Sequence, residues 1–144
     1  MNNSKSKILL AEDDLLIAMD LKLKLEEKGY EITSLVSTAL EAITRVEIDK
    51  PDLLLMDVQL SGSLNGIEAA NIISYKKKLP VIFLTTLGNK HLLSENKISA
   101  NFNYVLKPID TQILVTVIEE TFLRIRENAE AIKSNLSQSS TFTF

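Results

Sequence analysis

A chain of 144 residues, 45% of them hydrophobic and 24% charged, is expected to form one globular domain around one buried core. Its 16 basic and 19 acidic residues give a net charge of −3, which argues against a nucleic-acid partner because no excess of Lys and Arg can follow a phosphate backbone. The lack of Cys excludes disulfides and thiolate metal sites, and the single His91 cannot form an imidazole cluster, so a bound metal would need oxygen ligands. No long apolar stretch follows the opening MNNSKSK, and we therefore expect a cytoplasmic chain without membrane contact.

Five short apolar runs rich in Ile, Leu and Val predict the strands of one sheet. They occupy residues 8–11, 32–36, 53–56, 81–84 and 104–106. Most of these runs are apolar without a break, which is typical of parallel strands that are covered on both faces. Thr33 and Ser34 interrupt the second run, and we expect it at an edge of the sheet.

Segments with helical periodicity separate these runs. The first helix is expected to end at Lys28 and Gly29, a basic last turn followed by glycine, and to bury a stripe of Leu15, Leu16, Met19, Leu23 and Leu25. Thr38 and Glu41 have the spacing of a capping box at the start of the second helix. Gly66 opens a third helix, and the short polar segment 89–98 predicts a fourth.

Strands and helices that alternate in this way predict a doubly wound five-stranded parallel α/β sheet with helices on both faces. Ligands bind such a sheet beyond the carboxyl ends of its strands. Polar residues follow four of the five runs, so that they would share one rim: Glu12, Asp13 and Asp14 after the first, Asp57 after the third, Thr85 and Thr86 after the fourth, and Lys107 with Pro108 after the fifth.

Three neighbouring carboxylates at one strand end repel one another, and a bound divalent ion would relieve this repulsion. Carboxylate oxygens without imidazole or thiolate favour Mg²⁺, with Mn²⁺ as the alternative. Each residue also has an ordinary structural explanation: an acidic helix start for Glu12 to Asp14, a cap or turn for Asp57, and an exposed Lys107 before a turn. The convergence of all of them on one rim favours a functional site.

At this point the chain resembles the receiver domains of response regulators, the phosphorylatable half of two-component signalling. The resemblance runs from about residue 8 to residue 126, and its motifs appear in order as ILLAEDD, LLLMDVQL, NGIEAA, PVIFLTT and YVLKPID. Each motif is weak alone, but together at these spacings they are highly specific. The resemblance implies the chemotaxis-regulator type of flavodoxin-like fold and a phosphoprotein that catalyses only its own phosphorylation and dephosphorylation.

The resemblance also implies a role for each residue of the rim. Asp57 would accept the phosphoryl group, and Thr85 and Lys107 would contact its oxygens. Glu12 and Asp13 would form the acidic pair that holds Mg²⁺ together with Asp57 and the backbone carbonyl of Gln59, with Asp13 as a direct ligand. Thr85 and Tyr104 would form the switch.

The partners implied are a histidine kinase or phosphotransfer protein and an output partner or downstream domain that the sequence does not identify. Output would pass through the surface of the fourth helix, fifth strand and fifth helix. Two departures from the family are visible: Ser61 stands where Pro is usual, in a loop about one residue longer than the commonest form, and Thr86 replaces a small residue and is a candidate for crowding the pocket.

The segment after Thr111 predicts a long last helix. Its apolar residues recur at three- and four-residue spacing, which is the pattern of a coiled coil: Val115, Ile118, Phe122, Ile125, Ala129, Ile132 and Leu136. A homodimer through these heptads and the output surface, and a helix that frays after Arg126, are both open. We expect a receiver domain over residues 1–126 and a helical extension over 127–144 that ends in a disordered SQSSTFTF.

Three other functions are less consistent with the residues. A flavodoxin-like cofactor binder needs a phosphate-cradling loop after the first strand, where this chain has EDD. A phosphatase of the haloacid dehalogenase class needs a second carboxyl group at the position of Gln59. A degenerate receiver that only binds proteins would not need Asp57, Thr85 and Lys107 together. Residues 1–144 leave no room for a DNA-binding domain, so a stand-alone receiver and the front end of a longer protein both remain open.

Overall fold

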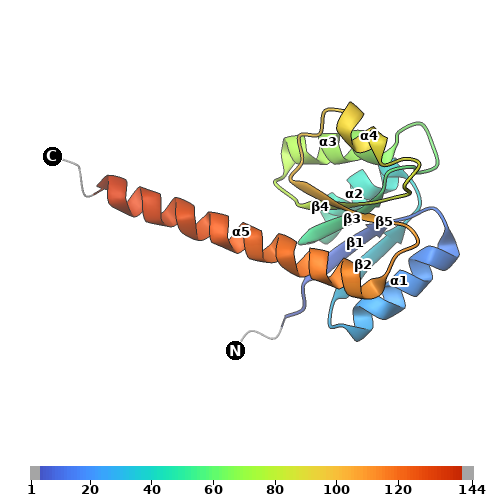
Figure 1. The fold of residues 1–144 in the computed structure, drawn as a ribbon, viewed down its shortest axis with the longest axis horizontal. Coiled ribbons are helices and arrows are strands. Elements are labelled where there is room, and N and C mark those ends of the chain that lie inside the picture. Colours follow the sequence, from blue (N-terminus) through green and yellow to red (C-terminus); the bar gives the residue numbers. More distant parts are fainter. Residues whose placement is uncertain (1–3, 141–144) are drawn as a thin grey trace.

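The computed structural model describes residues 4–140 and shows strands and helices in strict alternation (Figure 1). The strands are β1 (Lys7–Ala11), β2 (Glu31–Val36), β3 (Leu53–Asp57), β4 (Val81–Thr85) and β5 (Phe102–Leu106). The helices are α1 (Leu15–Glu27), α2 (Ala39–Asp49), α3 (Gly66–Lys76), α4 (His91–Glu95) and α5 (Thr111–Ser140). The predicted doubly wound α/β fold is confirmed.

All strand pairs are parallel, and their order across the sheet is β2-β1-β3-β4-β5. The interrupted second run is therefore an edge strand, as predicted, while β3 and β4 are buried along their whole length. The chain reverses its direction across the sheet between β1 and β3. This switch point brings the carboxyl ends of β1 and β3 together, where a doubly wound sheet binds its ligands.

The sheet separates two layers of core side chains. α1 and α5 cover one face and α2, α3 and α4 cover the other (Figure 1). Successive residues of β3 alternate between the two: Leu53 and Leu55 pack toward α1 and α5, whereas Leu54 and Met56 pack toward α2 and α3. This double burial explains why the strands are apolar without a break.

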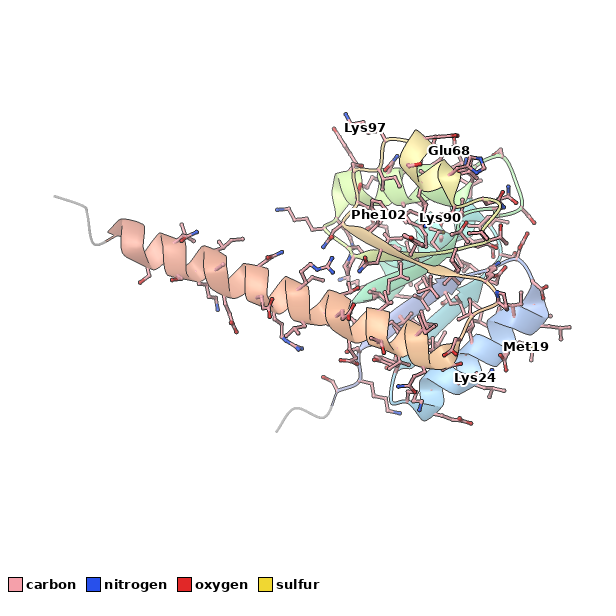
Figure 2. The ribbon with its side chains drawn as sticks, in the orientation of Figure 1. Met19, Lys24, Glu68, Lys90, Lys97 and Phe102 are labelled. Carbon is pink, nitrogen blue, oxygen red and sulfur yellow. The ribbon has the colours of Figure 1, made fainter. Side chains whose placement is uncertain are left out.

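The face of α1 that packs on the sheet differs from the predicted one. Ala18, Leu21 and Leu25 are buried, so Leu25 alone of the predicted stripe is confirmed. The four remaining members of the predicted stripe are all exposed: Leu15, Leu16, Met19 and Leu23. Met19, for example, points away from the sheet (Figure 2). α1 is apolar on both sides, and the small Ala18 lets the other side approach the sheet closely.

α4 is shorter than the predicted helix over residues 89–98, because it begins at His91 and ends at Glu95. The chain that follows it is held by a side chain from α3. The Asn71 amide donates to the carbonyl of Lys97 at 2.9 Å, and its oxygen accepts the Ser99 N–H, also at 2.9 Å. These bonds replace the helical hydrogen bonds that residues 97–99 would otherwise make.

α5 packs on the sheet over its first half and then leaves the domain (Figure 1). Leu114 and Ile118 are fully buried, and the Tyr30 hydroxyl donates to the Glu119 carboxylate. Farther along, Ile132 and Leu136 are 60% and 65% exposed. α5 includes the first four residues of the expected disordered tail, and residues 141–144 lie outside the described part.

Candidate functional site

Asp57 ends β3 and lies almost fully buried at the switch point of the sheet. Its Oδ1 accepts the Gln59 N–H at 2.9 Å, and its Oδ2 accepts a hydrogen bond from the Lys107 ammonium, also at 2.9 Å. The carboxylate is thus held on both oxygens by groups from two different strand ends.

Gly66 places the start of α3 directly against the Asp57 peptide. A Cβ on Gly66 would lie 2.0 Å from the Asp57 carbonyl oxygen and 2.9 Å from Cγ of Met56. The Gly66 N–H donates to the Val58 carbonyl at 2.9 Å. Asn65 caps α3 in a full capping box with Glu68, a signal that the sequence carries as N-G-I-E. The backbone around Asp57 is therefore supported from the side of α3, and only glycine permits this contact.

Glu12 and Lys107 complete the buried part of the site. Lys107 follows β5, and its Nζ lies 2.6 Å from Oε1 of Glu12 and 2.9 Å from Oδ2 of Asp57. The ammonium therefore bridges two carboxylates from β1 and β3. Oε1 of Glu12 is buried, and Lys107 is its charged partner, while Oε2 accepts the Asp14 N–H at 3.2 Å.

Burial and charge shift the pKa values of both partners. Burial raises the pKa of Glu12 to about 7, and Asp57 adds to this rise, while the Lys107 ammonium opposes it. Burial alone would lower the pKa of Lys107, but its contacts with Glu12 and Asp57 outweigh burial and raise it. Glu12 and Asp57 therefore share one ammonium group, which stays ionised between them.

Asp13 and Asp14 have different environments although they are adjacent. Asp13 is exposed, and its Oδ2 accepts a hydrogen bond from the Ser61 hydroxyl at 3.0 Å. Asp14 is the N-cap of α1, because its Oδ1 accepts the N–H groups of Leu16 and Ile17. The ordinary explanation of an acidic helix start therefore applies to Asp14.

The carboxylates of Glu12, Asp13 and Asp57 form a group that could hold a metal ion. One oxygen from each lies within 4.8 Å of the others. Three carboxylates near one ammonium group fit a divalent cation, and the all-oxygen donor set fits Mg²⁺ or Mn²⁺. Gln59 lies beside this group through its N–H bond to Asp57.

Among the residues that the structure describes, the Asp57 carboxylate is hydrogen-bonded to Gln59 and Lys107 and not to Thr85 or Tyr104. The Thr85 hydroxyl is buried and donates to the Thr86 carbonyl at 3.4 Å. The backbone carbonyl of Thr85 accepts the Lys107 N–H at 2.7 Å. Thr86 is exposed, and its hydroxyl accepts the Asn89 N–H. The Tyr104 ring is partly exposed on the edge strand β5, with the Lys90 ammonium 5.2 Å from its centre.

The structure brings together Glu12, Asp13, Asp57 and Lys107, with the backbone of Gln59 beside them. It adds three residues that sequence reasoning did not assign to the site: Ser61, Gly66 and Lys90. Two of these residues had a signal in the sequence: Ser61 replaces the usual Pro, and Gly66 directly follows the loop LSGSLN. Lys90 carried none, since its partner Tyr104 is on another element.

Comparison with known proteins agrees with this geometry. The family model of the response regulator receiver domain matches residues 8–119. The transcriptional regulatory protein PdtaR of Mycobacterium tuberculosis is 36% identical over 121 residues, which are 84% of this chain and 58% of that protein. The chain therefore spans little more than half the length of this relative.

Two solved structures are similar over most of the chain. The anti-anti-sigma factor PhyR of Bartonella quintana superimposes with a TM-score of 0.77 and 29% identity, over 89% of this chain and 51% of that one. A fusion protein that contains a segment of the yeast Spc42 trimeric coiled coil has a TM-score of 0.78 and 27% identity, over 99% of this chain and 98% of that one. With its fold, its rim of acidic residues and these relatives, the chain belongs to the response regulator receiver domain family of two-component signalling.

Proposed function

We propose that Asp57 accepts a phosphoryl group from the phosphohistidine of a histidine kinase or phosphotransfer protein, with Mg²⁺ as cofactor. The observation that carries this proposal is the position of the Asp57 carboxylate: it ends a buried central strand, faces Lys107, and lies within 4.8 Å of the acidic groups of Glu12 and Asp13. A carboxylate in this position lies at the rim of the sheet and is surrounded by groups that can neutralise a phosphoryl group.

The proposed transfer breaks the phosphorus–nitrogen bond of phosphohistidine and forms a phosphorus–oxygen bond to Asp57. No general base is needed because the attacking carboxylate is already an anion. Phosphoryl transfer depends mainly on positioning and on neutralising the equatorial oxygens. Lys107 would supply positive charge, and the Thr85 hydroxyl a hydrogen bond once it turns from the Thr86 carbonyl.

Glu12, Asp13, Asp57 and the carbonyl of Gln59 would hold Mg²⁺, or Mn²⁺ in its place. When bound, the ion would neutralise charge on the transferred group and on the carboxylates themselves. Burial is the main reason that the pKa of Glu12 is raised to about 7, and a bound cation would stabilise the ionised form of this buried carboxylate. Catalysis would extend only to the chain's own phosphorylation and dephosphorylation.

Switching would begin with movement of the Thr85 hydroxyl toward the new phosphoryl group. The Tyr104 ring is half exposed and would turn toward the space that Thr85 leaves. This movement would break the contact between the Lys90 ammonium and the ring, and so would alter the surface of α4, β5 and α5. A free-energy difference of a few kcal/mol is sufficient to shift the equilibrium between two existing arrangements of this surface.

Two surfaces would serve partners. The exposed apolar side of α1 adjoins the acidic rim, because α1 begins directly after Asp14, and it would contact the phosphodonor protein. The α4, β5 and α5 surface would contact the output partner or a further domain. Relatives differ in output, since one is described as a transcriptional regulator and another as an anti-anti-sigma factor.

Intact-mass measurement after incubation with acetyl phosphate and Mg²⁺ tests the proposal. The wild-type chain should gain the mass of one phosphoryl group, and Asp57→Asn should gain none. Asp52→Asn is a matched control because Asp52 lies at the other end of β3, where it accepts the Lys7 N–H. Equal labelling of the wild type and Asp57→Asn would refute the assignment.

A further inference from the structure

The Ser61 hydroxyl joins two loops that are far apart in the sequence. It donates to Oδ2 of Asp13 at 3.0 Å, and so connects the segment after β3 to the segment after β1. We propose that Ser61 is a positioning residue that holds the Asp13 carboxylate in the metal-binding arrangement. This inference rests on the proposed Mg²⁺ role of Asp13.

Asp13 is the member of the acidic group that most needs such a partner. Glu12 and Asp57 are buried and are held by Lys107, whereas Asp13 is exposed. Without a metal ion, the two neighbouring carboxylates repel Asp13, and its side chain has room to rotate into solvent. A hydrogen bond from Ser61 opposes this rotation.

The backbone that presents the Ser61 hydroxyl is itself anchored. Ser61 pairs with Thr38 in an isolated parallel bridge, and Leu60 and Leu64 on either side pack against the core. Gly62 has a φ of +104°, which lets the chain turn immediately after Ser61. The hydroxyl is therefore offered from a defined position, which reduces the entropy lost when the bond forms.

Ordering Asp13 before the metal arrives should strengthen metal binding. A ligand that is already oriented does not have to be ordered on binding, and partners of metal ligands typically change metal affinity by about 10- to 100-fold. The exposed position of this bond favours the lower end, about tenfold. Proline, the usual residue at this position in the family, has no hydroxyl and cannot make the bond.

Calorimetric titration of the whole chain with Mg²⁺ tests this role. Ser61→Ala should weaken Mg²⁺ affinity about tenfold, whereas Ser61→Thr, which retains a hydroxyl, should bind like the wild type. Ser63→Ala is the matched control, since Ser63 is exposed in the same loop. Thermal unfolding in EDTA should be the same for all four chains.

Phosphorylation by acetyl phosphate over a range of Mg²⁺ concentrations provides a second measurement. For Ser61→Ala, the half-saturating Mg²⁺ concentration should rise by the same factor, while the rate at saturating Mg²⁺ stays unchanged. Equal Mg²⁺ affinity of Ser61→Ala and the wild type would overturn the inference and leave the proposed function intact. Equal loss in Ser63→Ala, or no rescue by Ser61→Thr, would also overturn it, because loop structure would then be responsible. A wild-type chain that binds no Mg²⁺ would overturn both proposals.

Discussion

At the scale of single residues, one ammonium group holds two buried carboxylates in place. Lys107 lies within 3 Å of both Glu12 and Asp57, and both are almost inaccessible to solvent. Removing the cation leaves two like charges facing each other in a pocket with little water. Removing one partner of a buried ion pair lowers the unfolding free energy by more than the pair itself contributes, because the remaining charge stays buried without compensation.

Lys107→Ala should therefore remain folded but lose about 1 to 3 kcal/mol of unfolding free energy at pH 8, because Lys107 buries little apolar surface but compensates much charge. The loss should shrink as the pH falls toward 7, because removal of the Lys107 ammonium, which lowers the pKa of Glu12, lets Glu12 become protonated in the variant at a higher pH than in the wild type. Added Mg²⁺ should restore part of the loss.

Urea unfolding at both pH values, with and without Mg²⁺, checks this expectation. Lys24→Ala, which removes an exposed ion pair with Asp20, is the control and should change stability by less than about 0.5 kcal/mol. Unfolding of Lys107→Ala under all conditions, seen by circular dichroism, would instead show that Lys107 is mainly structural.

The residues of the rim could be predicted because topology alone brings them together. Apolar runs identify the strands, and parallel strands place their carboxyl ends at one edge. The approach of Glu12, Asp57 and Lys107 follows from that order. The bond between Ser61 and Asp13 could not be predicted, since it depends on side-chain directions in two irregular loops.

At the scale of elements, α1 shows how an apolar pattern can mislead. Large apolar residues occupy the side that faces solvent, and the side that faces the sheet combines Leu21 and Leu25 with the small Ala18. Periodicity predicts a helix here but does not decide between two apolar sides. Leu16 is 81% exposed, which is typical of an apolar surface that binds a partner protein.

Two leucines of α1 that are two positions apart should respond differently to truncation. Leu21→Ala should cost about 2 to 4 kcal/mol of unfolding free energy because Leu21 is buried in the core. Leu23→Ala should cost less than about 0.5 kcal/mol because Leu23 is exposed. Denaturant unfolding of both variants checks the orientation of the helix, and equal losses would contradict it.

The end of α2 is tied to the edge strand β2 through Asp49. Its carboxylate accepts the Ser34 hydroxyl at 2.7 Å and pairs with Arg45. Burial alone would raise the pKa of Asp49, but the bonds from Ser34 and Arg45 outweigh burial and lower it below its ordinary value of 3.8. The ionised carboxylate therefore stabilises the fold above pH 3.8, and this contribution is lost as the pH falls through the lowered pKa.

Asp49→Asn should lower the unfolding free energy by about 1 to 2 kcal/mol at pH 7, and the difference from wild type should shrink as the pH falls from 7 through the lowered pKa of Asp49. Asp20→Asn, at an exposed ion pair, serves as control. Urea unfolding across this pH range gives the measurement. A difference that persists unchanged into acid would show that packing, not charge, accounts for the effect of Asp49.

The short α4 was the element least accessible to prediction. Its sequence is polar and lacks a clear period, so local propensity barely decides where it ends. The contact that organises the following residues comes from Asn71, which precedes Lys97 by 26 residues and Ser99 by 28. The long runs of β1, β3 and β4 could be predicted because burial on both faces leaves a strong local pattern.

At the scale of the whole molecule, α5 carries an apolar seam that the domain covers only in part. Ile118 is buried, Phe122 and Ile125 are partly buried, and Ile132 and Leu136 are exposed beyond them. We propose that the part of α5 beyond Arg126 extends the receiver domain and self-associates through this seam.

Sedimentation of the whole chain and of a chain that ends at Arg126 tests the seam. The whole chain should form a dimer that truncation abolishes, and beryllofluoride, which mimics the phosphoryl group, should change the dimer affinity. Ile132→Asp should have the same effect as truncation, whereas Lys133→Ala, one position away, should not. A monomer at tens of micromolar in every state would refute self-association.

No helix in the part of the chain that the structure describes has the length and apolarity needed to span a bilayer. The long α5 has another mechanical property. Beyond Arg126 it reaches roughly 20 Å farther, at about 1.5 Å per residue, while its base rests on the sheet next to β5. A helix supported only at its base acts as a lever arm: a tilt of about 10° where it leaves the sheet would sweep its last turn through about 4 Å. A rearrangement near Tyr104 too small to change the core would thus be magnified at the far tip.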